Sequence, residues 1–180
     1  MRRPLTLVVC GAPLTARAAD IARALVDDDW DVSVIGTPAA AAWLDVDAVA
    51  AVTGRPIRQD FRAPTESKAG PEPEVLVVCP ATFNTINKAA HGVSDIYALG
   101  VLNEFLAMRL PTIVVPMVNN KLWGHPAWQA SLGVLVAAGT VLLDVQTGNR
   151  GAGPVVSGTG DRVVSEFDPR WLARELKTVT

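Results

Sequence analysis

Histidine and cysteine are scarce in this sequence. Its 180 residues include two histidines and two cysteines, which form no recognisable zinc-ligand spacing, so we predict no metal site. Cys10 and Cys79 each end an apolar, strand-like run, a position typical of reduced and buried thiols. A chain of this length can bury a full hydrophobic core without disulfides or metal.

The sequence also lacks an excess of one charge sign and a long apolar run. The formal net charge is -2 and the pI about 5.6. This charge gives no indication of a basic surface that would bind nucleic acid or an anionic membrane. The longest apolar stretch, 132–143, is too short to span a bilayer. The run from Leu5 to Cys10 stops at Gly11 without a signal-peptide cleavage site. These absences predict a soluble, cytoplasmic protein.

Short apolar runs alternate with helical patterns along the chain, without an internal repeat or a domain boundary. The alternation predicts βαβ units and hence a single α/β domain, residues 1–180, with a Rossmann-like (flavodoxin-like) three-layer sandwich around a central parallel sheet. The glycine-rich segment at about 146–162 has no apolar period and is interpreted as a substrate lid. Strands are predicted at 5–10, 32–35, 75–79, 112–115 and 141–143, and helices at 14–25, 39–52, 84–108 with a break near Gly92, 127–138 and from 168 or 169 onward.

The turns after the first two strands are candidate ligand contacts, because ligands bind beyond the carboxyl ends of parallel strands. The first strand runs into Gly11-Ala12-Pro13, a turn that opens a helix, and helix N-termini suit a phosphate. There is no G-x-G-x-x-G, however, and an ordinary turn also uses a single glycine. Thr37, before Pro38, is equally explained as a helix N-cap.

The turns after the next two strands carry more polar groups. Residues 80–85 place two hydroxyls and a carboxamide between a buried strand and a helix, whereas ordinary capping needs one such side chain, so this turn is predicted to be a ligand cradle. Residues 116–126 hold Trp123 among amides and a lysine. Such a tryptophan indicates an interface or a pocket wall, or else it packs under its own loop.

At these two segments the chain resembles the homo-oligomeric flavin-containing cysteine decarboxylases. That family includes phosphopantothenoylcysteine decarboxylase and the peptidyl-cysteine decarboxylases of lantibiotic synthesis. Residues 80–85 (PATFNT) match its PASANT motif, and residues 116–123 (PMVNNKLW) match its PxMNxxMW motif, with Val118 and Leu122 where methionines usually stand. Residues 48–56 and 86–95 extend the similarity.

The resemblance implies FMN as cofactor, bound across the carboxyl edge of the sheet. Asn119 would be the principal catalytic residue and hold the substrate carboxylate, with Trp123 and Lys121 shaping the substrate-binding region. In this family the flavin lies at a subunit interface of a trimer, sometimes within a dodecamer, so a homo-oligomer is expected. The implied cofactor contacts are Gly11, Ala12 and Thr15 on the phosphate side, and Thr37, Pro80, Ala81, Thr82, Phe83, Asn84 and Thr85 elsewhere.

The sequence departs from the family pattern at the expected catalytic base. Decarboxylating members carry a histidine shortly before the PASANT strand, but no histidine precedes His91 here. The family spacing leads to Glu66, whose carboxylate could act as base if burial raised its pKa. A solvated loop glutamate is the alternative, and Asp60 is a second candidate. His91 and His125 are interpreted as structural or surface residues.

A second departure concerns the glycine-rich flap, where the phosphopantothenoylcysteine enzymes use a cysteine. Residues 155–162 contain none, and the hydroxyl of Ser157 is far less acidic than a thiol, which disfavours the pantothenate reaction.

The leading interpretation is an FMN-dependent, decarboxylase-like enzyme for a small carboxylic acid or a cysteine-containing peptide. In the family, oxidised flavin accepts hydride from the carbon bearing sulfur, and the neighbouring carboxylate leaves as carbon dioxide. One alternative is an FMN carrier without turnover. Another is a flavin prenyltransferase of the same fold, for which Lys121 and Arg162 are the suggestive phosphate contacts. A nicotinamide enzyme is disfavoured because the glycine fingerprint and its acidic partner are absent.

Overall fold

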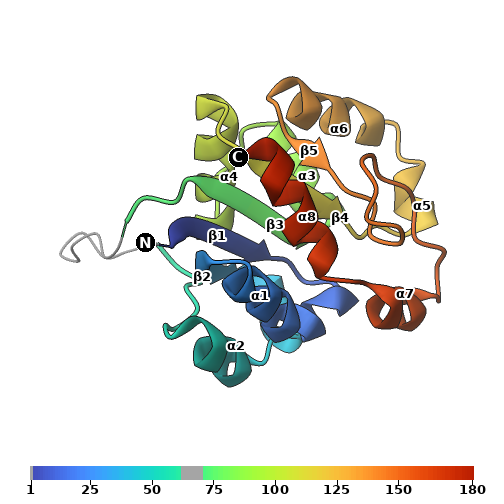
Figure 1. Ribbon diagram of the computed structural model, residues 1–180. Helices are drawn as coiled ribbons and strands as arrows, with labels where there is room; N and C mark the ends of the chain where they lie inside the picture. The colour runs from blue at the N-terminus through green and yellow to red at the C-terminus, as the bar shows by residue number, and fades with distance from the viewer. Residues whose placement is uncertain (1, 62–70) are drawn as a thin grey trace.

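The computed structural model describes residues 2–61 and 71–180. Its centre is a five-stranded sheet in the order β2-β1-β3-β4-β5, and every neighbouring pair is parallel (Figure 1). This confirms the predicted Rossmann-like α/β class. The strands are β1 (Arg3–Val9), β2 (Trp30–Gly36), β3 (Val75–Ala81), β4 (Thr112–Pro116) and β5 (Val141–Leu142).

Helices cover both faces of the sheet and complete three layers (Figure 1). One face packs against α1 (Ala18–Asp27), α2 (Val46–Thr53), α7 (Gly160–Glu166) and α8 (Arg170–Val179). The other packs against α3 (Phe83–Ala90), α4 (Tyr97–Met108) and α6 (Trp128–Ala137). The single turn α5 (Asn120–Trp123) and two short 3₁₀ helices, η1 (Pro13–Arg17) and η2 (Pro38–Ala42), lie in the connections.

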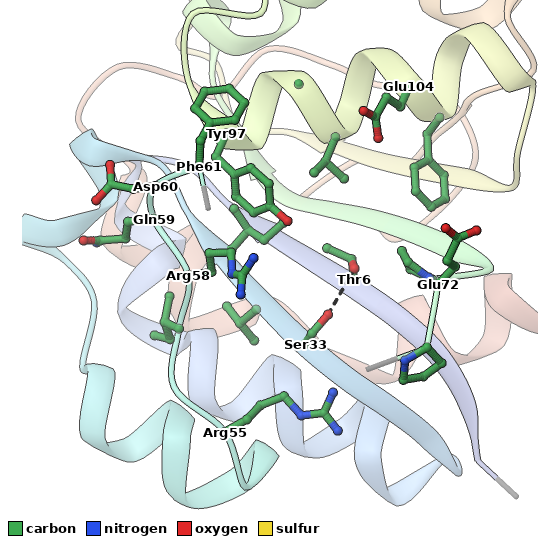
Figure 2. A pocket seen from close by; sticks show the side chains of 18 of the residues that line it. Thr6, Ser33, Arg55, Arg58, Gln59, Asp60, Phe61, Glu72, Tyr97 and Glu104 are labelled. Atoms are coloured by element: carbon green, nitrogen blue, oxygen red, sulfur yellow. Dashed lines mark hydrogen bonds between the residues drawn. The ribbon is translucent and has the colours of Figure 1, made fainter. Parts of the chain in front are cut away.

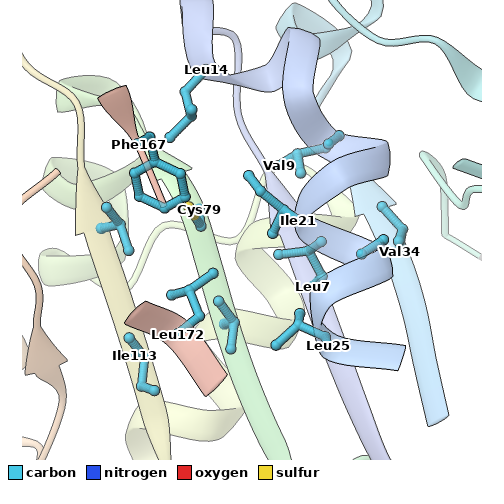
Figure 3. Packing of buried hydrophobic residues seen from close by; sticks show 14 of the residues in the cluster. Leu7, Val9, Leu14, Ile21, Leu25, Val34, Cys79, Ile113, Phe167 and Leu172 are labelled. Atoms are coloured by element: carbon cyan, nitrogen blue, oxygen red, sulfur yellow. The ribbon is translucent and has the colours of Figure 1, made fainter. Parts of the chain in front are cut away.

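The core explains why these apolar runs become parallel strands. All seven residues of β3 are buried, as expected for a strand covered on both faces. Successive side chains of β1 alternate between the two layers, so Leu7 and Val9 enter one cluster and Val8 the other. Figure 3 shows Leu7 beside Ile21 and Leu25 of α1. Each such fully buried leucine or isoleucine contributes about 1.5–3 kcal/mol to stability.

Two predicted helices are divided in the structure. The stretch predicted as one helix at 39–52 is η2 followed by α2, because the Asp45 carboxylate accepts the Ala48 N–H at 2.9 Å and starts a new helix. The stretch at 84–108 breaks where expected: α3 ends at Ala90, and Gly92 has a φ of 69°. The helix α7 was not predicted.

The glycine-rich segment consists of two differently held parts. Its first part is a hydrogen-bonded turn in which Asp144 Oδ1 accepts the N–H groups of Gln146 and Thr147, each at 2.9 Å. Gly148 presses this turn against α8: its φ is 64°, and a Cβ there would collide with the indole of Trp171. Only the later part, from about residue 155, reaches the carboxyl edge of the sheet.

The described residues contain neither a membrane-spanning helix nor a cluster of metal ligands. None of the helices in 2–61 and 71–180 has the length and apolarity needed to cross a membrane. In the same ranges, three or more histidine, cysteine or acidic side chains nowhere gather closely enough to hold a metal ion.

Candidate functional site

A pocket of about 460 Å³ lies at the carboxyl edge of β1, β3 and β4, within the size range of small-molecule sites. Its walls come from four segments: 11–13 after β1, 82–84 after β3, 117–122 after β4, and 155–160. The structure thus brings together Gly11, Ala12, Thr82, Phe83, Asn84 and Asn119, six of the residues named from the sequence.

The first turn is shaped by close packing of the backbone. A Cβ on Gly11 would lie 2.6 Å from the carbonyl oxygen of Ala39, so only glycine lets this turn approach η2. Thr15 is fully buried, and its hydroxyl donates to the carbonyl oxygen of Cys10. The Thr15 side chain therefore stabilises the turn through this hydrogen bond and is not part of the pocket wall.

Thr37 has a buried hydroxyl that the described protein does not use. The residue is 4% exposed, and its Oγ1 has no hydrogen-bond partner among the described residues. It does not cap η2, although it stands at the N-cap position. The capping explanation is therefore wrong for this side chain, and a polar ligand group would satisfy the hydroxyl. Thr37 itself does not line the 460 Å³ pocket.

The polar turn after β3 divides its groups between capping and the pocket. Thr82 Oγ1 accepts the Thr85 N–H at 3.3 Å and caps α3, and the two hydroxyl oxygens are 3.0 Å apart. Asn84 is exposed on the pocket wall, and its side chain makes no hydrogen bond within the described residues. Pro80 and Ala81 are buried at the end of β3, outside the wall. Asn84 is thus the side chain of this turn that is left for a ligand.

Asn119 presents hydrogen-bond donors to the pocket. Its Oδ1 accepts the N–H groups of Lys121 and Leu122, each at 3.0 Å, which caps α5. Because the oxygen is used in this way, the side-chain NH₂ is the group left for a ligand. An amide donor of this kind suits a carboxylate or carbonyl oxygen. Lys121 is exposed and does not line the pocket.

Trp123 belongs to an aromatic cluster beside the pocket. Its ring meets Trp128 edge-on at 5.3 Å between centroids, and Phe83 stacks on Trp128 at 5.2 Å. His125 packs edge-on against Phe83, and its Nδ1 accepts the Ala127 N–H at 3.1 Å. Trp123 therefore packs within its own region and is not a wall residue. Its role in substrate binding stays a prediction.

The structure does not bring the candidate base Asp60 to this pocket. Asp60 lines a separate and larger hollow of about 1090 Å³ between α4 and residues 55–61 (Figure 2). Thr6 and Ser33 also line that hollow, and their hydroxyl oxygens are 3.1 Å apart. Glu66 lies outside the described residues. Among the described residues, the wall of the 460 Å³ pocket contains no carboxylate and no histidine.

The two buried cysteines are not poised for nucleophilic chemistry. Burial raises the pKa of Cys10 to about 11, against a weaker lowering by hydrogen bonds from Thr85 and Thr82. Burial also raises the pKa of Cys79 strongly. The side chains belong to different core clusters on opposite faces of the sheet. Both are free, buried thiols, as the sequence predicted, and their raised pKa values keep them neutral near pH 7.

Comparison with known proteins identifies the family at this point. The family model described as Flavoprotein matches residues 1–166. The chain belongs to the flavoprotein family. This confirms the resemblance to flavin-containing cysteine decarboxylases that the two motifs indicated.

Individual relatives agree with this assignment. A cysteine/cysteine sulfinic acid decarboxylase from an unknown prokaryotic organism is 30% identical over 135 residues. That alignment covers 71% of this flavoprotein but 35% of the relative, so the chain spans about a third of that relative's length.

Two solved structures share the fold. A mutant PPC decarboxylase complexed with pantothenoylaminoethenethiol has a TM-score of 0.75 at 17% identity, covering 99% of this chain and 98% of its own. The FMN-dependent cysteine decarboxylase SpaF has a TM-score of 0.67 at 23% identity, covering 91% and 94%.

The sequence missed the apolar part of the pocket wall. Pro13, Met117 and Leu122 also line the pocket. Each follows strand β1 or β4, and this position in the sequence could have been used to predict them. Val155 joins the wall from far along the chain, through a parallel bridge with Asn119. No local pattern in the sequence predicts that pairing.

Proposed function

We propose that this flavoprotein binds FMN in the 460 Å³ pocket and acts as an FMN-dependent, decarboxylase-like enzyme. The substrate would be a small carboxylic acid or a cysteine-containing peptide. The observation that carries the proposal is a single pocket at the carboxyl edge of a parallel sheet, lined mainly by apolar residues and by two amide side chains, Asn84 and Asn119. The family assignment supports a flavin, and the motif resemblance supports FMN in particular.

The pocket has suitable groups for such a cofactor. The N–H groups of Phe83 and Asn84 in the first turn of α3 make no hydrogen bond within the described residues, and a helix N-terminus attracts a phosphate. These groups lie on the same pocket wall as Gly11 and Ala12, which the family resemblance assigned to the phosphate side. The unpartnered hydroxyl of Thr37 is a further candidate contact. When bound, FMN would supply the two-electron oxidation that side chains of the protein cannot perform.

The remaining chemistry falls to residues of the chain. The Asn119 NH₂ would hold and orient the substrate carboxylate, because its oxygen is occupied by the α5 cap. Apolar neighbours such as Met117 and Leu122 disfavour a charged carboxylate more than neutral carbon dioxide. Binding and orientation by Asn119 together with this apolar wall favour decarboxylation.

The base and the assembly are proposed from the family resemblance. Glu66 is proposed as the base. The variant Glu66→Gln, which replaces the carboxylate with an amide, should therefore turn over substrate more slowly and bind FMN as the wild type does. A homo-oligomer, either a trimer or a dodecamer, is the proposed assembly. Light scattering on the purified protein would measure the assembly directly, and a monomer with full activity would refute it.

The test of function combines the visible spectrum of the protein with release of carbon dioxide. Peptides ending in cysteine should release carbon dioxide, whereas the same peptides ending in serine should not. Flavin absorption without any release would favour the carrier alternative. Consumption of dimethylallyl phosphate would favour a prenyltransferase, but neither Lys121 nor Arg162 lies on the pocket wall.

A further inference from the structure

Residues 156–159 form a tight turn on one side of the pocket, which we call the flap. The N–H and hydroxyl of Thr159 both donate to the carbonyl oxygen of Val156, at 3.0 and 2.8 Å, and Gly158 has a φ of 88°. Val156 is 57% exposed, whereas Val155 just before it is 5% exposed. The flap is therefore a compact turn that follows a buried anchor.

A single side chain, that of Asn120 at the start of α5, connects this flap to a distant part of the chain. The Ser157 N–H donates to Asn120 Oδ1 at 2.9 Å, and the Asn120 N–H donates to the carbonyl oxygen of Val155 at 2.8 Å. Within residues 2–61 and 71–180, the Ser157–Asn120 bond is the one hydrogen bond between the flap and a segment distant in sequence.

We infer that Asn120 is a positioning residue that latches the flap over the pocket. Its neighbour Asn119 cannot share this task, since the Asn119 oxygen caps α5. Asn120 is not itself a wall residue, whereas Ser157 and Gly158 are, so Asn120 acts on the pocket through the flap. Breaking the latch leaves the flap attached through the backbone, between the Val155 anchor and α7.

The latch has a consequence for the bound ligand. A flap that opens more often shortens the time that a molecule stays in the pocket. This consequence rests on the proposed function, because it takes FMN as the molecule bound there. The hydrogen bond between Asn120 and Ser157 does not depend on that proposal, so the two can be tested separately.

Amide hydrogen exchange tests the latch in protein without added flavin. Asn120→Ala should speed exchange of the Ser157 amide roughly threefold to tenfold, the value of one net hydrogen bond. Asn120→Asp keeps an acceptor oxygen at the same position and should retain the wild-type rate. Unchanged exchange in Asn120→Ala, or equal loss of protection in both variants, would overturn the latch.

Flavin release tests its consequence. The dissociation rate of FMN, followed by recovery of flavin fluorescence after dilution, should rise by a similar factor in Asn120→Ala. Gln146→Ala is the matched control, because it removes the 3.3 Å bond from Gln146 Nε2 to the carbonyl oxygen of Pro154, outside the flap. Equal release from wild type and Asn120→Ala, or equal acceleration by the control, would overturn the role of Asn120 in retention. A wild type that binds no FMN would refute the proposed function, and amide exchange would then decide the latch alone.

Discussion

Replacing Thr37 with valine should affect the stability of the flavin-free protein and its affinity for FMN in opposite directions. Thr37 is 4% exposed, and its Oγ1 has no partner among the described residues. A buried hydroxyl without a partner costs about 1–3 kcal/mol. Valine has nearly the same shape without the hydroxyl, so Thr37→Val should raise the free energy of unfolding by about 1 kcal/mol.

The same substitution should weaken FMN binding, because the Thr37 hydroxyl is a proposed cofactor contact. A net hydrogen bond contributes about 0.5–1.5 kcal/mol, so the Kd for FMN should rise roughly threefold to tenfold. Denaturant unfolding of the flavin-free protein measures the first effect. Quenching of flavin fluorescence during titration measures the second.

Thr140 offers a matched control for this experiment. It is 5% exposed, its Oγ1 also lacks a partner among the described residues, and it precedes β5 at the edge of the sheet opposite the pocket. Thr140→Val should therefore stabilise the protein to a similar extent and leave the Kd for FMN unchanged. A destabilised Thr37→Val variant, or one that binds FMN as tightly as wild type, would refute the reasoning about Thr37.

Five further substitutions, one of them a control, probe the site and the packing of the fold. Asn84→Asp should stabilise the first turn of α3 by about 0.3–1 kcal/mol but weaken FMN retention through repulsion of the phosphate, and unchanged retention would remove Asn84 from the site. Asn119→Asp keeps an oxygen to cap α5 but loses the NH₂ donors, so carbon dioxide release should fall roughly tenfold to a hundredfold at an unchanged melting temperature; loss of flavin instead would mean that its role is misplaced. Gly148→Ala should lower the free energy of unfolding, measured with denaturant, by about 2 kcal/mol or more, because φ is 64° and a Cβ would collide with the indole of Trp171. Gly139→Ala is the control: it also has a positive φ but open space around it, so it should lower the free energy of unfolding by about 1 kcal/mol. Burial raises the pKa of Cys10 from 9.0 to about 11 in the folded protein, so the thiol ionises first in the unfolded state as pH rises. Between these two pH values the free energy of unfolding should therefore fall by up to about 1.4 kcal/mol per pH unit. The fall should be less steep in Cys10→Ala.

The strands could be predicted because each is a short, mainly apolar run, and β3 at the centre of the sheet is buried along its whole length. Continuous runs such as Val75 to Cys79 have no polar face to present to water, so a parallel sheet between helical layers is the structure that buries them. The helix α7 was missed since it is seven residues long and buries only Val163. A single buried side chain leaves no helical period to detect.

The polar residues of the site were predicted with less success, for a different physical reason. Asn84 and Asn119 follow directly after strands, and topology brings them to one edge of the sheet. Thr15 and Thr85 also lie in turns that follow strands, β1 and β3, but their hydroxyls bond within the protein, to Cys10 and Thr82. A sequence shows which hydroxyls are near a ligand site, but not which of them the backbone already uses.

Titration of the flavin-free protein with FMN, followed by quenching of flavin fluorescence, tests the proposed pocket most directly. We predict saturable binding at one FMN per chain, and weaker binding of riboflavin, because riboflavin lacks the phosphate that would meet the first turn of α3. A well-folded protein that leaves the fluorescence of FMN unchanged would contradict the assignment of a flavin to this edge of the sheet.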